Sequence, residues 1–155
     1  MVSISWCSKQ KNGIRIIEPN PNMSDSYISL AEASIGTMNR EKDKNIVFSV
    51  AAGYYSMYYS LYSILMRIGV KCEIHKCTIK FMENFLNSYF SKEDVKIIYN
   101  AFKLRNNMQY YVDKVVDNTE IEKLMKNAPD FFAKCKEVIA SFNEDDIKRI
   151  RNSLK

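Results

Sequence analysis

The sequence has few of the residues that interrupt secondary structure. It contains only four glycines and three prolines in 155 residues, a length that fits one domain. Long segments therefore lack turn signals, and this favours an all-α protein. The opening residues also lack a basic segment followed by an apolar one, so we expect no signal peptide.

Charge is absent from a long central segment. No charged residue occurs between Asn45 and Met66, and this segment carries five tyrosines. As a helix it would be about 33 Å long, so it must be buried nearly all round or cross a membrane. Tyrosines and serines occupy what would be the bilayer centre, whereas tyrosine belongs at the membrane interfaces. We therefore predict a buried helix and no membrane partner.

The four cysteines are irregularly spaced, at positions 7, 72, 77 and 135. A chain of this size needs no covalent staples, so we expect reduced thiols and a cytoplasmic location. Cys72, His75 and Cys77 lie close in sequence, but the single-residue gap between His75 and Cys77 is awkward for tetrahedral zinc. We expect no metal and no cofactor. The net charge of +5 permits an acidic partner without requiring one, because the lysines are scattered.

Periodicity and capping residues predict a set of long helices joined by short loops. A short helix is expected at 3–11 and an extended arm at 14–21; a hairpin pairing 4–7 with 14–17 is the alternative. Asn22 or Ser24 should cap the first long helix, and Gly69 should end the second. The long helices are expected at 24–40, 43–68, 75–89, 91–114 and 118–142.

Pro129 should kink or split the last of these helices, and a short final helix should begin at 143. Together these elements predict an all-α, antiparallel four- to five-helix up-and-down bundle. We divide this single domain into an N-terminal helix and extended arm (1–21), the bundle (22–142) and a short C-terminal helix (143–155).

The fourth long helix carries two apolar stripes. One is a complete core face, formed by Ile97, Ala101, Leu104, Met108, Tyr111 and Val115. The second lies about 100° around the helix and contains two polar residues; it is formed by Val95, Ile98, Phe102, Arg105, Gln109 and Val112. An arginine among apolar neighbours is costly unless something pairs with it. Either an acid such as Glu83, Glu93 or Asp113 pairs with Arg105, or this face meets a second copy of the chain.

Several short motifs follow one another in a fixed order: Ala52-Gly53-Tyr54-Tyr55-Ser56-Met57-Tyr58, Leu65, Gly69-Val70, His75-Lys76 and Leu104-Arg105-x4-Tyr110. Their order and spacing resemble the HEPN superfamily, and more narrowly its small prokaryotic and archaeal branch with an aromatic-rich second helix and an Arg-x4-Tyr fourth helix. The resemblance covers roughly residues 24–142. It implies a four- to five-helix bundle, usually a homodimer, and often a toxin–antitoxin pair with a minimal nucleotidyltransferase.

Catalytic members of this superfamily are metal-independent ribonucleases with an Arg-x4-6-His motif. The resemblance places Arg105 at the position that stabilises phosphate charge, Asn106 at the polar position after it, and Tyr110 at the histidine position. Tyrosine, with an ordinary pKa near ~10, is a poor base at neutral pH. We expect Tyr110 either to donate a hydrogen bond to phosphate or to accept a nucleotidyl group from a partner enzyme.

Two functional hypotheses follow. The first is a dimeric, RNA-associated, toxin-like protein paired with a nucleotidyltransferase, which would be a metal-independent endoribonuclease if it is an enzyme. The alternative is a non-catalytic interaction or nucleotide-binding module that its partner regulates. In both, the candidate catalytic residues are Arg105 and Tyr110, and the candidate ligand- or phosphate-binding residues are Arg105, Asn106, Gln109, His75 and Lys76.

Overall fold

The computed structural model describes residues 2–154. Over this range the protein is an all-α helical bundle with one small two-stranded sheet, which confirms the predicted fold class. Its elements in chain order are α1 (Ile4–Lys9), β1 (Arg15–Ile16), α2 (Pro21–Glu41), α3 (Ile46–Ile68), β2 (Val70–Lys71), α4 (His75–Phe85), α5 (Lys92–Tyr110), α6 (Asn118–Ser141) and α7 (Glu144–Asn152).

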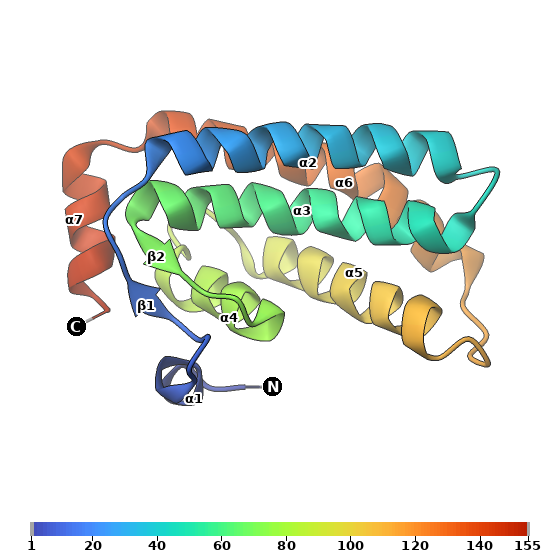
Figure 1. The fold of residues 1–155 in the computed structure, drawn as a ribbon, viewed down its shortest axis with the longest axis horizontal. Coiled ribbons are helices and arrows are strands. Elements are labelled where there is room, and N and C mark those ends of the chain that lie inside the picture. Colours follow the sequence, from blue (N-terminus) through green and yellow to red (C-terminus); the bar gives the residue numbers. More distant parts are fainter. Residues whose placement is uncertain (1, 155) are drawn as a thin grey trace.

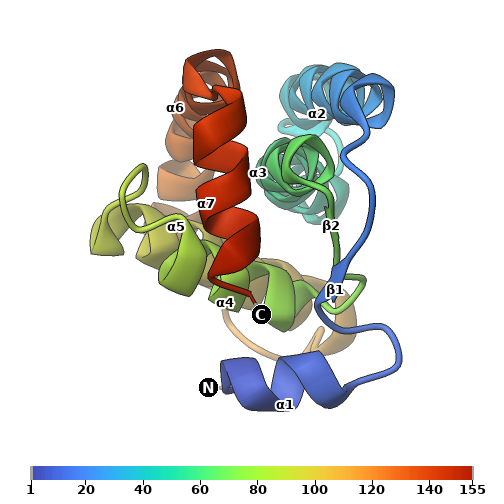
Figure 2. The ribbon, with the colours of Figure 1, turned by 90° about the vertical axis from the view of Figure 1, so that its left-hand side faces the viewer.

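The charge-free helix α3 lies at the centre of the bundle. It packs against α2, α5 and α6, which are the other long helices. The chain runs in one direction along α2 and α5 and in the opposite direction along α3 and α6 (Figure 1). The view along the bundle shows α3 between the others, with α4 and α1 below it (Figure 2). Most side chains of α3 are buried, so the missing charge is explained by contact on several sides.

The first long helix begins earlier than predicted, because Asn20 and Pro21 start it. The Asn20 side chain accepts a hydrogen bond from the backbone N–H of Met23 at 2.9 Å. Proline suits the first helical position, where its missing N–H would have no partner. The expected caps are therefore wrong: Ser24 is buried inside the helix, with its Oγ 2.9 Å from the Oγ of Ser63.

The end of α3 is organised by Gly69, as predicted. Gly69 has φ +84°, a conformation that costs side-chain-bearing residues energy, and its N–H donates to the carbonyls of Leu65 and Met66. The side chain of Arg151, in α7, stabilises this end of α3. Its Nη1 donates to the carbonyls of Ile17, Ile68 and Gly69 at 2.7, 3.0 and 2.9 Å. One guanidinium thus links the N-terminal arm, α3 and the C-terminal helix.

The N-terminal arm is extended, as predicted, but its pairing differs from the hairpin alternative. Residues 4–7 lie in α1, and β1 instead pairs antiparallel with β2, with Arg15 opposite Lys71. Two other helices are shorter than predicted: α4 ends at Phe85 and α5 ends at Tyr110. Helix α6 continues through Pro129 without being split.

The expectation of four free thiols is wrong for one pair. Cys7 of α1 and Cys77 of α4 form a disulfide, while Cys72 and Cys135 are free and buried. Irregular spacing along the sequence could not show that α1 packs against α4. Disulfides are typical of oxidising compartments, so the cytoplasmic location stays a prediction. Within residues 2–154, no helix has both the length and the apolar character that a membrane span requires.

Candidate functional site

The candidate site surrounds the guanidinium of Arg105, and three helices build it. Helix α5 supplies Arg105, α3 supplies Tyr54 and Tyr55, and α4 begins at His75. Because α3 packs against both α4 and α5, Tyr54 and Tyr55 contact both His75 and Arg105. Arg105 is only 5% exposed, which is unusual for a charged residue without an ionic partner.

Aromatic rings surround this guanidinium. The Arg105 Cζ lies 5.0 Å from the ring centre of Tyr54, 5.4 Å from that of Tyr55, 5.7 Å from that of Phe102 and 5.8 Å from that of Tyr110. All four distances fall within the range of cation–π attraction, about 6 Å. The Nη1 group also donates to the Tyr110 hydroxyl at 3.4 Å, which is a long hydrogen bond.

No carboxylate neutralises Arg105 in the part of the chain that the structure describes. The predicted ion pair is wrong: Glu83 pairs with Lys80, and Glu93 lies 3.8 Å from Lys96. Among residues 2–154, the buried Nε of Arg105 finds no hydrogen-bond partner. A buried donor without a partner costs about 1–3 kcal/mol. The site therefore contains a positive charge that is held by rings and hydroxyls and is only partly satisfied.

Tyr54 connects Arg105 to His75. The Tyr54 hydroxyl lies 2.6 Å from His75 Nδ1, and the imidazole stacks on Tyr58 with ring centres 4.0 Å apart and planes 6° apart. Because the Arg105 cation lies against the Tyr54 ring and can only donate hydrogen bonds, it favours the arrangement in which the Tyr54 hydroxyl donates its proton to His75 Nδ1. We assign this tautomer, with the remaining imidazole proton on Nε2, from the hydrogen-bond pattern.

The protonation states of these groups follow from their burial. Burial raises the pKa of Tyr54 well above its usual range, and the nearby Arg105 charge offsets only part of that rise. Burial, helped by repulsion from Arg105, lowers the pKa of His75 to about 4. Both groups are therefore neutral at pH 7, and Arg105 provides the only formal charge in this aromatic cluster of residues 54, 55, 58, 75, 102 and 105.

The structure brings three of the predicted site residues close together and places the others apart from them. Arg105 and Tyr110 are in contact, and His75 reaches Arg105 through Tyr54. Within residues 2–154 the side chains of Asn106 and Gln109 form no hydrogen bond to Arg105, although Gln109 follows it by one helical turn. Lys76 is exposed and lines a cavity between α4 and α5 instead.

The two stripes of α5 are used differently from the prediction. Ile98, Phe102 and Arg105, expected at a dimer interface, are already buried within the single chain. Tyr111 and Val115, expected in the core, are 52% and 100% exposed, because the helix ends at Tyr110 and its periodicity ends with it. A dimer therefore stays a prediction, but this stripe cannot serve as its interface without repacking.

Sequence reasoning missed the aromatic surroundings of Arg105. Tyr54 and Tyr58 are four residues apart and therefore share one face of a helix, but this spacing gives no sign that the face meets Arg105 and His75. The same holds for Phe102, which was placed beside Arg105 only as an apolar neighbour. One available signal was the high tyrosine content of a buried helix, because buried hydroxyls usually need polar partners.

Comparisons of the chain with models of protein families and with curated proteins gave no match. The HEPN resemblance is therefore carried by the motifs of this sequence alone. No group of three or more His, Cys, Asp and Glu residues in residues 2–154 is arranged to hold a metal ion. The disulfide occupies Cys77, so this thiol cannot join Cys72 and His75 as a ligand while it is oxidised.

Proposed function

We propose that this protein is an RNA-associated, HEPN-type component of a toxin–antitoxin pair, in which Arg105 binds a phosphate group of the RNA. The observation that carries the proposal is the buried guanidinium without an acidic partner in the described chain. Phosphate oxygens would supply the missing negative charge and accept hydrogen bonds from the guanidinium. Arginine–phosphate hydrogen bonds are among the stronger polar contacts in proteins.

Tyr110 gives a phosphate a route to Arg105. Its side chain is 69% exposed, it is the last residue of α5, and its hydrogen bond to the guanidinium is long. A phosphate oxygen can take the place of the Tyr110 hydroxyl at little cost, and the released hydroxyl can then donate to the same phosphate. The negative charge of the ligand would offset the free-energy cost of burying the Arg105 charge, which is not compensated in the protein without ligand.

The site supports phosphate recognition better than RNA cleavage. A general base works best when its pKa lies near the working pH, whereas that of His75 is about 4. Its Nδ1 is also engaged by Tyr54. We therefore expect tight RNA binding with weak or no metal-independent hydrolysis in the free protein.

A partly exposed stripe of α3 supports the proposed homodimer. Phe48, Ala52, Tyr55 and Tyr59 lie on one helical face; Phe48 is 61% exposed and the other three are half-buried. An apolar helix face that is only partly covered suits an interface with a second copy. Tyr55 also contacts Arg105, so a dimer built on this face would bring the two arginine sites close together.

The experiment compares Arg105→Met with Arg40→Met, which removes the same charge from the exposed surface of α2. Binding of a labelled single-stranded RNA is measured by fluorescence anisotropy, and growth inhibition is measured in cells that produce each variant. We expect Arg105→Met to weaken RNA binding at least tenfold and to relieve growth inhibition, with Arg40→Met close to wild type. Equal RNA binding and equal toxicity for all three proteins would refute the proposal.

A second function is favoured by the exposure of the Tyr110 hydroxyl. If a nucleotidyltransferase regulates the protein, Tyr110 is the accessible hydroxyl next to the phosphate-binding arginine. Incubation with a candidate partner and ATP should then add the mass of one or more adenylyl groups to the wild type but not to Tyr110→Phe. Modification at other positions in both proteins would exclude this role for Tyr110.

A further inference from the structure

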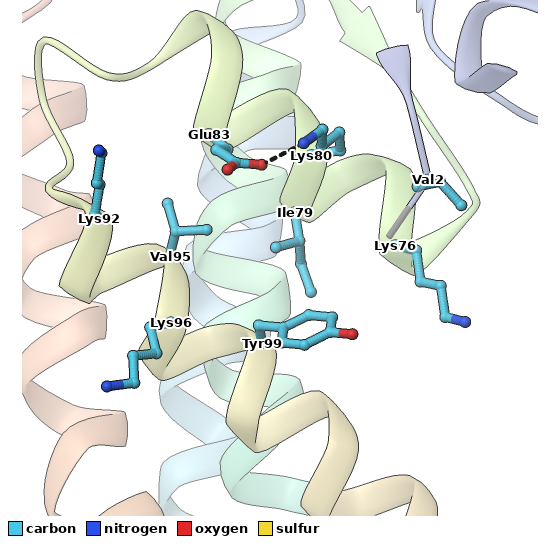
Figure 3. Close-up of a pocket in the computed structure, with 9 residues that line it drawn as sticks. All are labelled: Val2, Lys76, Ile79, Lys80, Glu83, Lys92, Val95, Lys96 and Tyr99. Carbon is cyan, nitrogen blue, oxygen red and sulfur yellow. Dashed lines mark hydrogen bonds and ion pairs between the residues drawn. The ribbon is translucent and has the colours of Figure 1, made fainter. Parts of the chain in front are cut away.

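A separate cavity of about 450 Å³ lies between α4 and α5 (Figure 3). Its apolar part consists of Val2 near the N-terminus, Ile79 from α4, and Val95 and Tyr99 from α5. Lysines stand around it, with Lys76 on one side and Lys92 and Lys96 on the other (Figure 3). The volume falls in the range of about 300–1,000 Å³ that is typical of small-ligand sites.

The charge around this cavity is mostly positive and weakly compensated. Within residues 2–154, Lys76 and Lys92 form no ion pair. Lys96 lies 3.8 Å from Glu93, and both side chains are more than 60% exposed, so this pair contributes little. Lys80 does pair with Glu83, at 2.7 Å. An anionic ligand would thus meet at least three lysines whose charges are available.

The same face of α5 continues from the cavity to the Arg105 site. The residues on this face follow one another at intervals of three or four, so they form one line along the helix. They are Lys92, Lys96, Tyr99, Lys103, Asn106 and Tyr110. From its first to its last member the line rises about 27 Å, at ~1.5 Å per residue. Lys103 Nζ lies 5.9 Å from the centre of the Tyr99 ring, so a cation and a ring stand side by side midway along it.

We propose that the α4–α5 cavity binds a nucleoside phosphate, either as a free nucleotide or as one unit of a single-stranded RNA that follows α5 toward Arg105. The base would stack on Tyr99, and the phosphates would contact Lys92 and Lys96. Alternating cations and ring faces are the usual features of surfaces that bind single strands without reading their sequence. An acidic protein segment would use the lysines but not the half-buried ring. The RNA path rests on the proposed function, whereas the nucleotide site does not.

The experiment compares Lys92→Ala combined with Lys96→Ala against Lys126→Ala combined with Lys136→Ala. The control pair removes two exposed lysines from α6 and causes the same change in net charge. Fluorescence anisotropy is measured with labelled oligoadenylate and with labelled AMP over a range of salt concentrations. If two phosphate contacts are lost, the slope of log affinity against log salt should decrease by about 1.4, because each contact on a single strand contributes ~0.7. The control pair should leave this slope unchanged.

Tyr99 is tested with two substitutions. Tyr99→Phe keeps the ring and should bind like the wild type, whereas Tyr99→Leu should weaken binding by about 5- to 150-fold, the usual cost of one stacked base. Far-UV circular dichroism checks that both variants fold. Binding of AMP that depends on Tyr99 identifies a nucleotide site; dependence seen only with oligoadenylate identifies a unit of RNA.

The outcomes separate this inference from the proposed function. Equal losses for the two lysine pairs, or competition by polyglutamate as strong as that by oligoadenylate, would mean general charge attraction and overturn the inference. If only Arg105→Met weakens RNA binding, the inference fails and the proposed function stands. If only the cavity variants weaken binding, the nucleotide site stands and the phosphate role of Arg105 fails. Absence of any nucleotide or RNA binding by the wild type would overturn both.

Discussion

Replacing Arg105 by methionine should lower the free energy of unfolding by at most about 1 kcal/mol, and any larger change should be a gain in stability. Two effects oppose each other at this position. The buried Nε without a hydrogen-bond partner destabilises the folded protein by about 1–3 kcal/mol, whereas the cation–π contacts with the surrounding rings stabilise it by about 0.5–2 kcal/mol. Methionine has a flexible apolar side chain that can fill the same space. Urea titration followed by far-UV circular dichroism measures the difference in the free energy of unfolding between the variant and the wild type. In a thermal melt, each 1 kcal/mol of this difference should shift the melting temperature by about 2–4 °C.

Arg151→Met is the matched comparison, because this guanidinium is well satisfied. It donates to three backbone carbonyls, at the end of α3 and in the N-terminal arm. Removing hydrogen bonds from a charged group costs about 1.5–3 kcal/mol, so this variant should be clearly less stable. A loss above about 3 kcal/mol for Arg105→Met would show that the buried guanidinium is a structural anchor. The reasoning that it is held for a ligand would then be wrong.

Three further outcomes are expected. The pKa of His75 is about 4 in the folded protein against 6.5 ordinarily, so the unfolded chain takes up a proton first as the pH falls. The contribution of His75 to the free energy of unfolding is therefore fully present above pH 6.5 and is lost as the pH falls toward 4. His75→Gln should remove this part of the pH dependence, as measured by urea titrations at several pH values. For the Cys7–Cys77 disulfide, a separation of 70 residues gives an upper value of about 4 kcal/mol for its loss in Cys7→Ser. Thiol titration of the denatured, unreduced protein should find two thiols, and finding four would contradict the disulfide. Gly69→Ala should destabilise by at least about 1–2 kcal/mol, because φ is +84° and the added Cβ would lie only 2.6 Å from the Ile17 carbonyl oxygen and 2.7 Å from the Pro19 nitrogen. Gly36→Ala inside α2 should instead stabilise by about 0.5–1 kcal/mol. Thermal melts in which Gly69→Ala is the more stable of the two variants would contradict this argument.

The elements that sequence predicted well are those with local physical causes. The burial of α3 follows from the absence of charge, and its end follows from Gly69, the residue that most readily takes a positive φ. The start of α5 at the predicted position follows from Ser91 and Asp94, which form a capping box. The end of α5 was predicted poorly, because apolar residues continue to Val115 and no glycine or proline marks the boundary.

Other predictions failed because they depend on which distant segments meet. Nothing near Cys7 in the sequence indicates Cys77, and nothing near Arg15 indicates the β2 strand. The surroundings of Arg105 are of the same kind. The sequence showed a charge among apolar residues and suggested acids as its partners, whereas the fold supplies rings from α3 and a hydroxyl from its own helix.

The sequence by itself determined that this protein is a helical bundle built around one charge-free helix, because periodicity, capping and composition act over a few residues at a time. It also singled out Arg105, since a cation in an apolar stripe is costly wherever the stripe packs. Only the tertiary structure decided that Arg105 faces the tyrosines of α3, that His75 is neutral behind Tyr54, and that α1 is bonded to α4. Those outcomes depend on contacts between helices far apart in the chain, and no local pattern encodes them.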